Sequence, residues 1–219
     1  MYAHLSSRWV ADGRVNHLVT TLPGDSEAID SLFWNGFGLA AVDAIRDLKP
    51  VHKPESDAVI RRATPKDADA VQGLSTELRQ HLAAAPVFLF PEDERGRVFY
   101  EHLLKDSSNA IWLAFCGGKA VGCIGLAPAS YCAACIIRDG RTASITRAFT
   151  KEHLRGRGVG SALLNTALEW ARSAGYERCA VDFEPANISG ARFWLRHFLP
   201  ICHTMIRHVD ERVLHMRKE

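Results

Sequence analysis

The sequence predicts an α/β fold in which strands and helices are mixed around one sheet. Short apolar runs typical of strands alternate with segments whose apolar residues recur every three or four positions, which is the helical period. Two of the runs are separated only by Gly117-Gly118-Lys119, which indicates a β-hairpin. The 219 residues are enough for one good-sized domain, or for one domain with an additional fragment.

The composition is that of an ordinary soluble globular protein. Apolar residues make up 47% of the chain and charged residues 24%, which argues against disorder, collagen or a membrane protein. A formal net charge of +2 is too small to indicate nucleic-acid binding. The first residues lack a secretory signal pattern, and no run of about 20 apolar residues occurs. We therefore expect a cytoplasmic protein without nucleic-acid or membrane partners.

The six cysteines are expected to be free thiols in such a protein. Cys132 and Cys135 form a Cys-x-x-Cys pair. A zinc site would need a second pair of Cys or His residues at a matching spacing. We therefore expect no metal centre.

A segment from Asp47 to Asp57 carries two prolines, alternating charges and almost no apolar residues, which is typical of a linker. We therefore divide the chain into a partial unit at residues 1–50, a linker at 51–57 and a main domain at 58–219. With about 50 residues, the partial unit is too short to be expected to fold as an independent domain.

The main domain is expected to begin with a strand at 59–62. Thr64, Pro65 and Asp67 then mark a helix start, because they suit the cap, the first helical position and the positive helix end. This helix runs to about Ala84, and a second helix follows near 93–104. The predicted hairpin pairs residues 110–116 with residues 120–126.

A strand at 143–149 precedes a helix at about 158–174, whose apolar residues share one face and which Gly175 ends. A strand at 178–183, a helix at 188–196 and a strand at 201–206 follow. We expect the last strand to return through a bend into a further strand at 212–216.

A weak internal repeat is also present. Phe37 and Phe198, Ile45 and Ile206, and Arg46 and Arg207 all lie 161 positions apart. Residues 17–46 are therefore predicted to form a second unit of strand, helix and hairpin, like residues 178–207.

The chemistry-bearing segment is the glycine-rich loop between the strand at 143–149 and the following helix. Its residues are Arg155, Gly156, Arg157, Gly158, Val159, Gly160 and Ser161. Glycines let successive N–H groups converge, and the helix N-terminus adds about half a positive charge, so a pyrophosphate can bind there. The spacing fits neither a Walker loop nor the dinucleotide fingerprint, although the geometry alone does not choose the nucleotide.

The pattern Arg-x-x-Gly-x-Gly, carried by Arg155, Gly158 and Gly160, resembles the pyrophosphate loop of the GNAT (GCN5-related N-acetyltransferase) superfamily. Asn187 and the later Phe193-Trp194 resemble its second motif, and the resemblance covers about residues 59–216. It implies a GNAT fold, with a mixed, mostly antiparallel central sheet flanked by helices. It also implies transfer of an acetyl group from acetyl-CoA to a primary amine of a small molecule or peptide by direct attack.

The resemblance further assigns roles. The main-chain amides of residues 155–161 would bind the pyrophosphate. Main-chain groups of Phe149 and Thr150 would bind the pantetheine arm and polarise the thioester carbonyl. Asn187 would contact the pantetheine or the adenosine end, although a helix N-cap is an equal explanation for it.

The sequence departs from the family pattern where the thiolate leaving group should be protonated. Trp194 stands where the family has a tyrosine, and an indole N–H has no useful acidity. Glu184 is our first candidate for the general base that neutralises the acceptor amine, with a surface carboxylate as the competing interpretation. We expect only one of Asp182 and Glu184 to face the site.

Acceptor specificity is expected to come from the first two helices of the main domain and the break between them. His81, Phe88, Phe90 and Tyr100 cluster there in sequence, although they could equally be core. These residues do not identify the amine.

The fragment at 1–50 resembles the tail of another GNAT unit through Phe33-Trp34-Asn35-Gly36-Phe37, so the chain resembles a shortened tandem protein with a degenerate half. The fragment has no pyrophosphate loop, which predicts one CoA per chain. It should pack on the main domain or on a second copy in a homodimer. Two other functions stay open: a catalytically weak CoA-binding regulatory or interaction module, and a nucleotide-binding protein unrelated to CoA.

Overall fold

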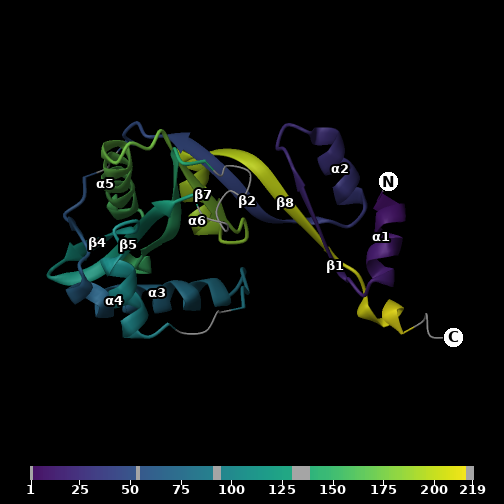
Figure 1. The fold of residues 1–219 in the computed structure, drawn as a ribbon, viewed down its shortest axis with the longest axis horizontal. Helices are drawn as coiled ribbons and strands as arrows, with labels where there is room; N and C mark the ends of the chain where they lie inside the picture. Colours follow the sequence, from purple (N-terminus) through teal and green to yellow (C-terminus); the bar gives the residue numbers. More distant parts are fainter. Residues whose placement is uncertain (1, 53–54, 91–94, 130–138, 216–219) are drawn as a thin grey trace.

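The computed structural model describes residues 2–52, 55–90, 95–129 and 139–215. Within these residues the strands form one eight-stranded sheet in the order β1-β8-β2-β7-β6-β5-β4-β3 (Figure 1). The elements are α1 (Tyr2–Ala11), β1 (Asn16–Thr21), α2 (Ser26–Trp34), β2 (Gly38–Asp47), β3 (Val59–Arg62), α3 (Ala68–Ala83), α4 (Arg97–Lys105), β4 (Ala110–Cys116), β5 (Lys119–Pro128), β6 (Thr142–Thr150), α5 (Val159–Ser173), β7 (Arg178–Phe183), α6 (Ile188–His197) and β8 (Leu199–His208), with 3-10 turns at Pro65–Asp67, Glu152–Leu154 and Glu211–Leu214.

The predicted mixed, mostly antiparallel sheet is confirmed. Neighbouring strands pair antiparallel except β6 and β7, which run parallel. The predicted hairpin is β4-β5, and it turns at Gly117 and Gly118, whose φ angles of 54° and 77° match the left-handed conformation of a tight hairpin turn.

The predicted helix start at Thr64 is present as a short 3-10 turn that leads into α3. The carboxylate of Asp67 accepts hydrogen bonds from the backbone N–H and the hydroxyl of Thr64, at 2.8 and 2.9 Å. Arg61 donates two more hydrogen bonds to the same carboxylate, and this interaction holds the pKa of Asp67 well below its usual range. The ion pair thus joins the end of β3 to the start of the helix.

Helices cover both faces of the sheet. Alternate residues of β4 face opposite sides: Trp112 belongs to the cluster under α5 and α6, and Leu113 to the cluster under α3 and α4. The buried stripe of α5 includes Leu164 and Leu168, and Gly175, with a φ of 86°, ends that helix as predicted.

The strand predicted at 212–216 is wrong for its described part, because residues 211–214 form a 3-10 turn and Met216 lies outside the described residues. The side-chain carboxylate of Asp210 accepts a hydrogen bond from the N–H of Arg212 and starts the turn. The places on the two sides of β8 are instead taken by β1 and β2, from the other end of the chain. β2 pairs antiparallel with β7 on one side and with β8 on the other. Its buried residues Val42 and Ala44 belong to the core under α5 and α6.

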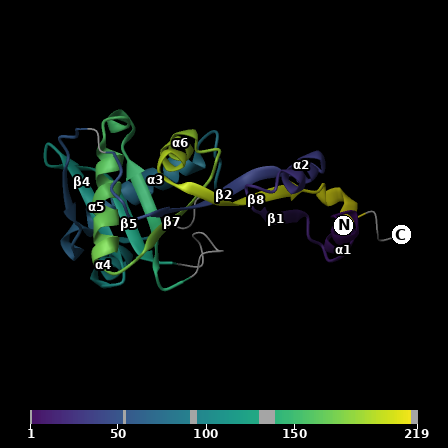
Figure 2. The ribbon, with the colours of Figure 1, turned by 90° about the horizontal axis from the view of Figure 1, so that it is seen from above.

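The N-terminal elements α1, β1 and α2 lie together at one end of the molecule, beyond the helices that flank the rest of the sheet (Figures 1 and 2). β8 and β2 run from the body into this end, which we call the arm and define as residues 2–41. The arm has a strand, a helix and a strand in the order of β7-α6-β8, and β2 and β8 begin and end 161 positions apart. A single strand thus stands where a hairpin was predicted. The origin of the arm in a shortened tandem protein stays a prediction.

The segment after β2 is held against the body. Leu48 and Val51 are buried, and the side-chain amide of Asn165 on α5 pairs with the backbone N–H and C=O of Val51 at 2.7 and 2.9 Å. Asn165 therefore satisfies both backbone groups of a residue that leaves the sheet.

Candidate functional site

The sheet opens between its two parallel strands. β6 and β7 are paired only from Thr142 to Ser144 on β6, opposite Arg178 to Ala180 on β7. Beyond Ser144 the strands separate, so the later residues of β6 are paired only on the side of β5. The free side of β6 faces a cavity of about 500 Å³. This volume is in the range of small-molecule and cofactor sites.

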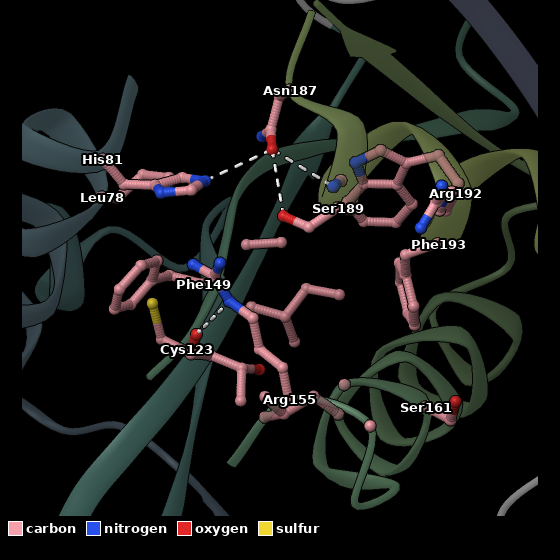
Figure 3. A pocket seen from close by; sticks show the side chains of 18 of the residues that line it. Leu78, His81, Cys123, Phe149, Arg155, Ser161, Asn187, Ser189, Arg192 and Phe193 are labelled. Atoms are coloured by element: carbon pink, nitrogen blue, oxygen red, sulfur yellow. Dashed lines mark hydrogen bonds between the residues drawn. The ribbon is translucent and has the colours of Figure 1, made fainter. Parts of the chain in front are cut away.

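The cavity lies between the ends of α3, β6, the glycine loop, α5 and α6 (Figure 3). Eight of the sequence-predicted residues line it: Phe149, Thr150, Arg155, Gly156, Gly158, Gly160, Ser161 and Asn187. Arg157 is exposed and Val159 is buried in the core, so the side chains of these two predicted residues are not part of the lining. Their main-chain groups still belong to the loop.

The glycine loop has the backbone conformation that the sequence indicates. Gly156 and Gly158 have φ angles of 77° and 76°, which L-residues with side chains rarely adopt. Gly158 is the N-cap of α5, so the unpaired N–H groups of the first helical turn point toward the same cavity. At Gly160 a Cβ would lie 3.3 Å from the ring of Phe193 on α6. The missing side chain thus keeps α5 and α6 close at the cavity wall.

Arg155 is fixed at the start of this loop. Its Nε donates a hydrogen bond of 3.1 Å to the carbonyl of Thr150, and its guanidinium lies over the ring of Phe149. Arg192 and Arg196 on α6 also line the cavity. Three guanidinium groups and a helix N-terminus therefore make this cavity suited to an anion.

Asn187 both caps α6 and faces the cavity. Its side-chain oxygen accepts hydrogen bonds from the N–H of Gly190 and the hydroxyl of Ser189, each at 3.2 Å. Nε2 of His81 on α3 lies 3.3 Å from the same oxygen, so these groups converge across the cavity mouth (Figure 3). Both explanations offered for Asn187 from the sequence fit this geometry.

Comparison with known proteins identifies the family. The model of the acetyltransferase (GNAT) family matches residues 75–198, which is more than half of the chain. The chain belongs to the GNAT acetyltransferase family. No curated protein matches it.

Solved structures with the same fold include the aminoglycoside acetyltransferase AAC(6')-Iy in complex with a bisubstrate analogue of CoA. That chain has 19% identity and a TM-score of 0.52, with 64% of this chain and 89% of that one covered. A mutant of the BH1408 protein from Bacillus halodurans has 16% identity, 63% and 90% coverage and a TM-score of 0.53. A functionally unknown protein from Staphylococcus epidermidis has 11% identity and a TM-score of 0.51, and covers 95% of this chain and 78% of its own. At these identities the likeness shows the GNAT fold alone.

The residues that sequence reasoning missed in this GNAT cavity come mainly from α6 and α3. Ser189, Arg192 and Arg196 join the wall from α6, and Leu78 joins it from α3. Their positions follow from the close approach of the two helices across the open end of the sheet, which helical periodicity does not report. His81 of α3 lines this cavity too, although the sequence predicted it as an acceptor-facing residue.

Trp194, which stands where the GNAT pattern has a tyrosine, is among the residues that line the cavity and is 8% exposed. It packs edge-on against Phe193 and Phe198. The indole ring is therefore packed in the core. Its N–H is not acidic enough to protonate a thiolate.

Glu184 is not among the residues that line the cavity. Asp182 is not a lining residue either, and Glu184 follows Phe183, the last residue of β7, so strand alternation does not decide which of the two faces the site. The pKa of Asp182 is raised to about 6, mainly by burial and to a smaller extent by the neighbouring carboxylates of Glu184 and Asp43. Asp43 stands directly opposite Asp182 on β2.

Cys132 and Cys135 lie outside the described residues. Within the described ranges, no group of three or more His, Cys, Asp or Glu side chains could hold a metal ion. The helices in this part of the chain are all too short or too polar to cross a membrane.

Proposed function

We propose that this GNAT protein transfers an acetyl group from acetyl-CoA to a primary amine of a small molecule or peptide. The observation that carries the proposal is the meeting of two features at one cavity. A helix begins at a loop with two left-handed glycines, and a strand beside it has an unpaired edge. The first feature suits a diphosphate, and the second suits an extended arm that pairs with main-chain groups.

In this proposal the amides of residues 155–161 hold the pyrophosphate, with Arg155, Arg192 and Arg196 as the nearby positive charges. The free side of Phe149 and Thr150 pairs with the pantetheine arm. A backbone N–H on this edge can also donate to the thioester carbonyl oxygen as negative charge develops on it. These roles place the reacting carbonyl beside the last residues of β6, near Phe149 and Thr150.

The reaction needs one proton removed and one supplied. The neutral amine nitrogen attacks the carbonyl carbon, the carbon–sulfur bond breaks, the nitrogen loses a proton and the thiolate takes one. Glu184 remains our sequence-based proposal for the base. His81 is the titratable side chain that the structure brings to the cavity mouth, within hydrogen-bond distance of Asn187. It is therefore a second candidate for handling a proton in place of the tyrosine.

A second function is favoured by one specific observation. Trp194 occupies the position of the proton donor and is locked in the core. A CoA-binding regulatory or interaction module would tolerate this residue without loss.

Titration of acetyl-CoA together with a thiol-release assay over a panel of primary amines separates the two functions. An enzyme binds acetyl-CoA and releases thiol with at least one amine. A regulatory module binds it and releases none. Absence of acetyl-CoA binding, or equal competition by ADP, would contradict both and favour a nucleotide protein unrelated to CoA. Glu184→Gln and His81→Gln then assign the base, because loss of the true base removes the low-pH limb of the rate profile.

A further inference from the structure

A second cavity, of about 370 Å³, lies next to the first one. The same strand serves both: Thr146 and Arg147 of β6 line the second cavity, and the next residues, from Ala148 to Thr150, line the first. Leu78 of α3 lines both. An amine bound in the second cavity would therefore lie beside Thr146 and Arg147, next to the stretch of β6 where the proposed function places the thioester.

The strand is built to turn two consecutive side chains into this cavity. Gly125 of β5 pairs with Arg147, but Leu126 pairs with Ile145, so Thr146 is an extra residue at a β-bulge. Neighbouring residues on a regular strand face opposite sides, and a bulge changes that alternation. The bulge explains how Thr146 and Arg147 both reach the same cavity.

Gly125 provides the space in which Arg147 lies. A Cβ at Gly125 would come within 2.9 Å of Cγ of Arg147, closer than real Cβ contacts allow. The arginine stem therefore crosses β5 directly over the missing side chain. Its guanidinium donates a 3.2 Å hydrogen bond to the hydroxyl of Ser75 on α3 and lies 5.6 Å from the centre of the Tyr100 ring on α4.

Arg147 has no anionic partner in the described part of the chain. The ion pairs found there do not include it, and its Nε is shielded from solvent without a hydrogen-bond partner. The described residues that line the cavity include no aspartate or glutamate, and Arg95 adds positive charge to the wall. A half-buried guanidinium without a carboxylate is costly unless a bound anion completes the site.

The rest of the wall is apolar and aromatic. Leu82 and Leu89 line it, as do Phe90, Phe99 and Tyr100. Of the four residues predicted to face the acceptor, Phe90 and Tyr100 do line this cavity, His81 lines the first one, and Phe88 lines neither.

We propose that the acceptor is a small amine that also carries a carboxylate, and that Arg147 binds this carboxylate through its planar fork while the apolar wall holds the rest of the molecule. The proposal rests on the acetyltransferase function proposed above and names its substrate class, the amino acids with apolar side chains. Arginine is suited to bidentate carboxylate recognition. The nearby positive charges also disfavour the ammonium form of the acceptor, and the amine must be neutral to attack.

The same charges argue against a polycationic acceptor. One protein with the same fold is an aminoglycoside N-acetyltransferase, and aminoglycosides carry several ammonium groups. In this chain such a substrate would bring positive charges against the guanidinium groups of the cavity wall.

The test compares matched acceptors in the thiol-release assay with the full-length protein and acetyl-CoA. L-phenylalanine is set against its amide and against 2-phenylethylamine, L-leucine against its amide and 3-methylbutylamine, and kanamycin serves as the polycation. The amides have the less basic amines, which biases the comparison against the proposal. We expect the carboxylate-bearing member of each set to have a kcat/KM at least about tenfold higher.

Arg147→Gln should remove this preference, and Arg147→Lys, which keeps the charge but not the fork, should keep only part of it. Arg172→Gln is the matched control, because it removes one exposed positive charge from α5, on the other face of the sheet. It should leave the preference unchanged. All variants should keep the acetyl-CoA affinity of the wild type within about twofold. If Arg147→Gln does not fold, Ser75→Ala and Gly125→Ala displace the same guanidinium and should weaken the preference.

Equal or better turnover of the amides, the simple amines or kanamycin by the wild type would overturn the inference, as would a preference that survives in Arg147→Gln. These results leave the acetyltransferase function intact, whereas absence of acetyl-CoA binding removes the function itself. If acetyl-CoA binds but no amine is acetylated, the same sets are titrated into the CoA complex. The carboxylate-bearing member must then bind more tightly for the inference to stand.

Discussion

The two strand–helix–strand units of this protein have the same order of elements but different surroundings. The N-cap of α6 is Asn187 and that of α2 is Asp25, and each cap side chain accepts a hydrogen bond from a backbone N–H of its own helix. α6 buries Ala191 and Trp194. α2 buries none of its residues, and the side chain 161 positions before Trp194, Phe33, is 64% exposed.

The difference shows where the site comes from. β7 and α6 lie beside β6, the glycine loop and α5, and the gap between them is the proposed donor cavity. β1 is at the edge of the sheet, with β8 as its neighbour. The same strand–helix–strand order is thus present in both units, but only the unit that has further elements packed beside it forms a cavity that could bind a cofactor.

The largest expected effect comes from removing β2 with the arm. A chain lacking residues 1–47 should lose cooperative unfolding, because β2 pairs with strands on both sides and buries Val42 and Ala44. The free energy of unfolding that is lost with β2 should exceed the marginal stability of a typical domain, which is about 5–15 kcal/mol. A chain lacking residues 2–11 removes α1, which has no buried residue, and should still unfold cooperatively in urea. If the chain that lacks residues 1–47 unfolds as cooperatively as the full chain, then β2 is not an integral part of the body and the account of the arm is wrong.

The next effect compares equivalent side chains in the two units. Trp194→Ala should cost about 3–5 kcal/mol of unfolding free energy, since it removes a large buried ring. Phe33→Ala should change it by no more than about 0.5 kcal/mol. Chemical denaturation of both variants measures the difference. Similar costs at the two positions would mean that Phe33 is buried in solution, for example against a second copy of the chain.

The smallest effect concerns the carboxylates that face each other where β2 meets β7. The pKa of Asp182 is raised to about 6 by burial first and by Glu184 and Asp43 second. Its protonated form is therefore favoured in the folded state, so its contribution to stability is full below about pH 4 and is lost as the pH rises through 6. Asp182→Asn should flatten this dependence and stabilise the protein slightly at neutral pH. The gain should stay under about 1 kcal/mol: although the surrounding atoms desolvate the carboxyl group, the Asp182 residue is still exposed and solvent screens its charge. A variant with the pH dependence of the wild type would show that Asp182 titrates normally.

The sequence predicted the elements whose residues interact locally. The hairpin at Gly117-Gly118, the start of α3 and the glycine loop each depend on residues a few positions apart, and all three are present as expected. The strand predicted at 212–216 failed because the partners of β8 are β1 and β2, both more than 150 residues away in the sequence. Periodicity shows that a strand exists but does not show which strand lies beside it.

The residues of the two cavities also fall into those that a local sequence pattern predicts and those that depend on tertiary packing. The loop from Arg155 to Ser161 could be found from its glycines, but Arg192 and Arg196 reach the cavity only because α6 packs against α5. Arg147 needed two further facts that sequence patterns do not report, the bulge at Thr146 and the glycine across from it.

The central claim is that the first turn of α5 binds the diphosphate of acetyl-CoA, and titration of acetyl-CoA into Gly160→Asp tests it most directly. The variant places a carboxylate at the cavity wall, and we predict an affinity about 100-fold lower, because like charges in contact cost several kcal/mol. Gly160→Asn has the same size without the charge and should lose less. Gly24→Asp, at an open position before α2, should bind like the wild type. Wild-type affinity in a folded Gly160→Asp protein would contradict the account.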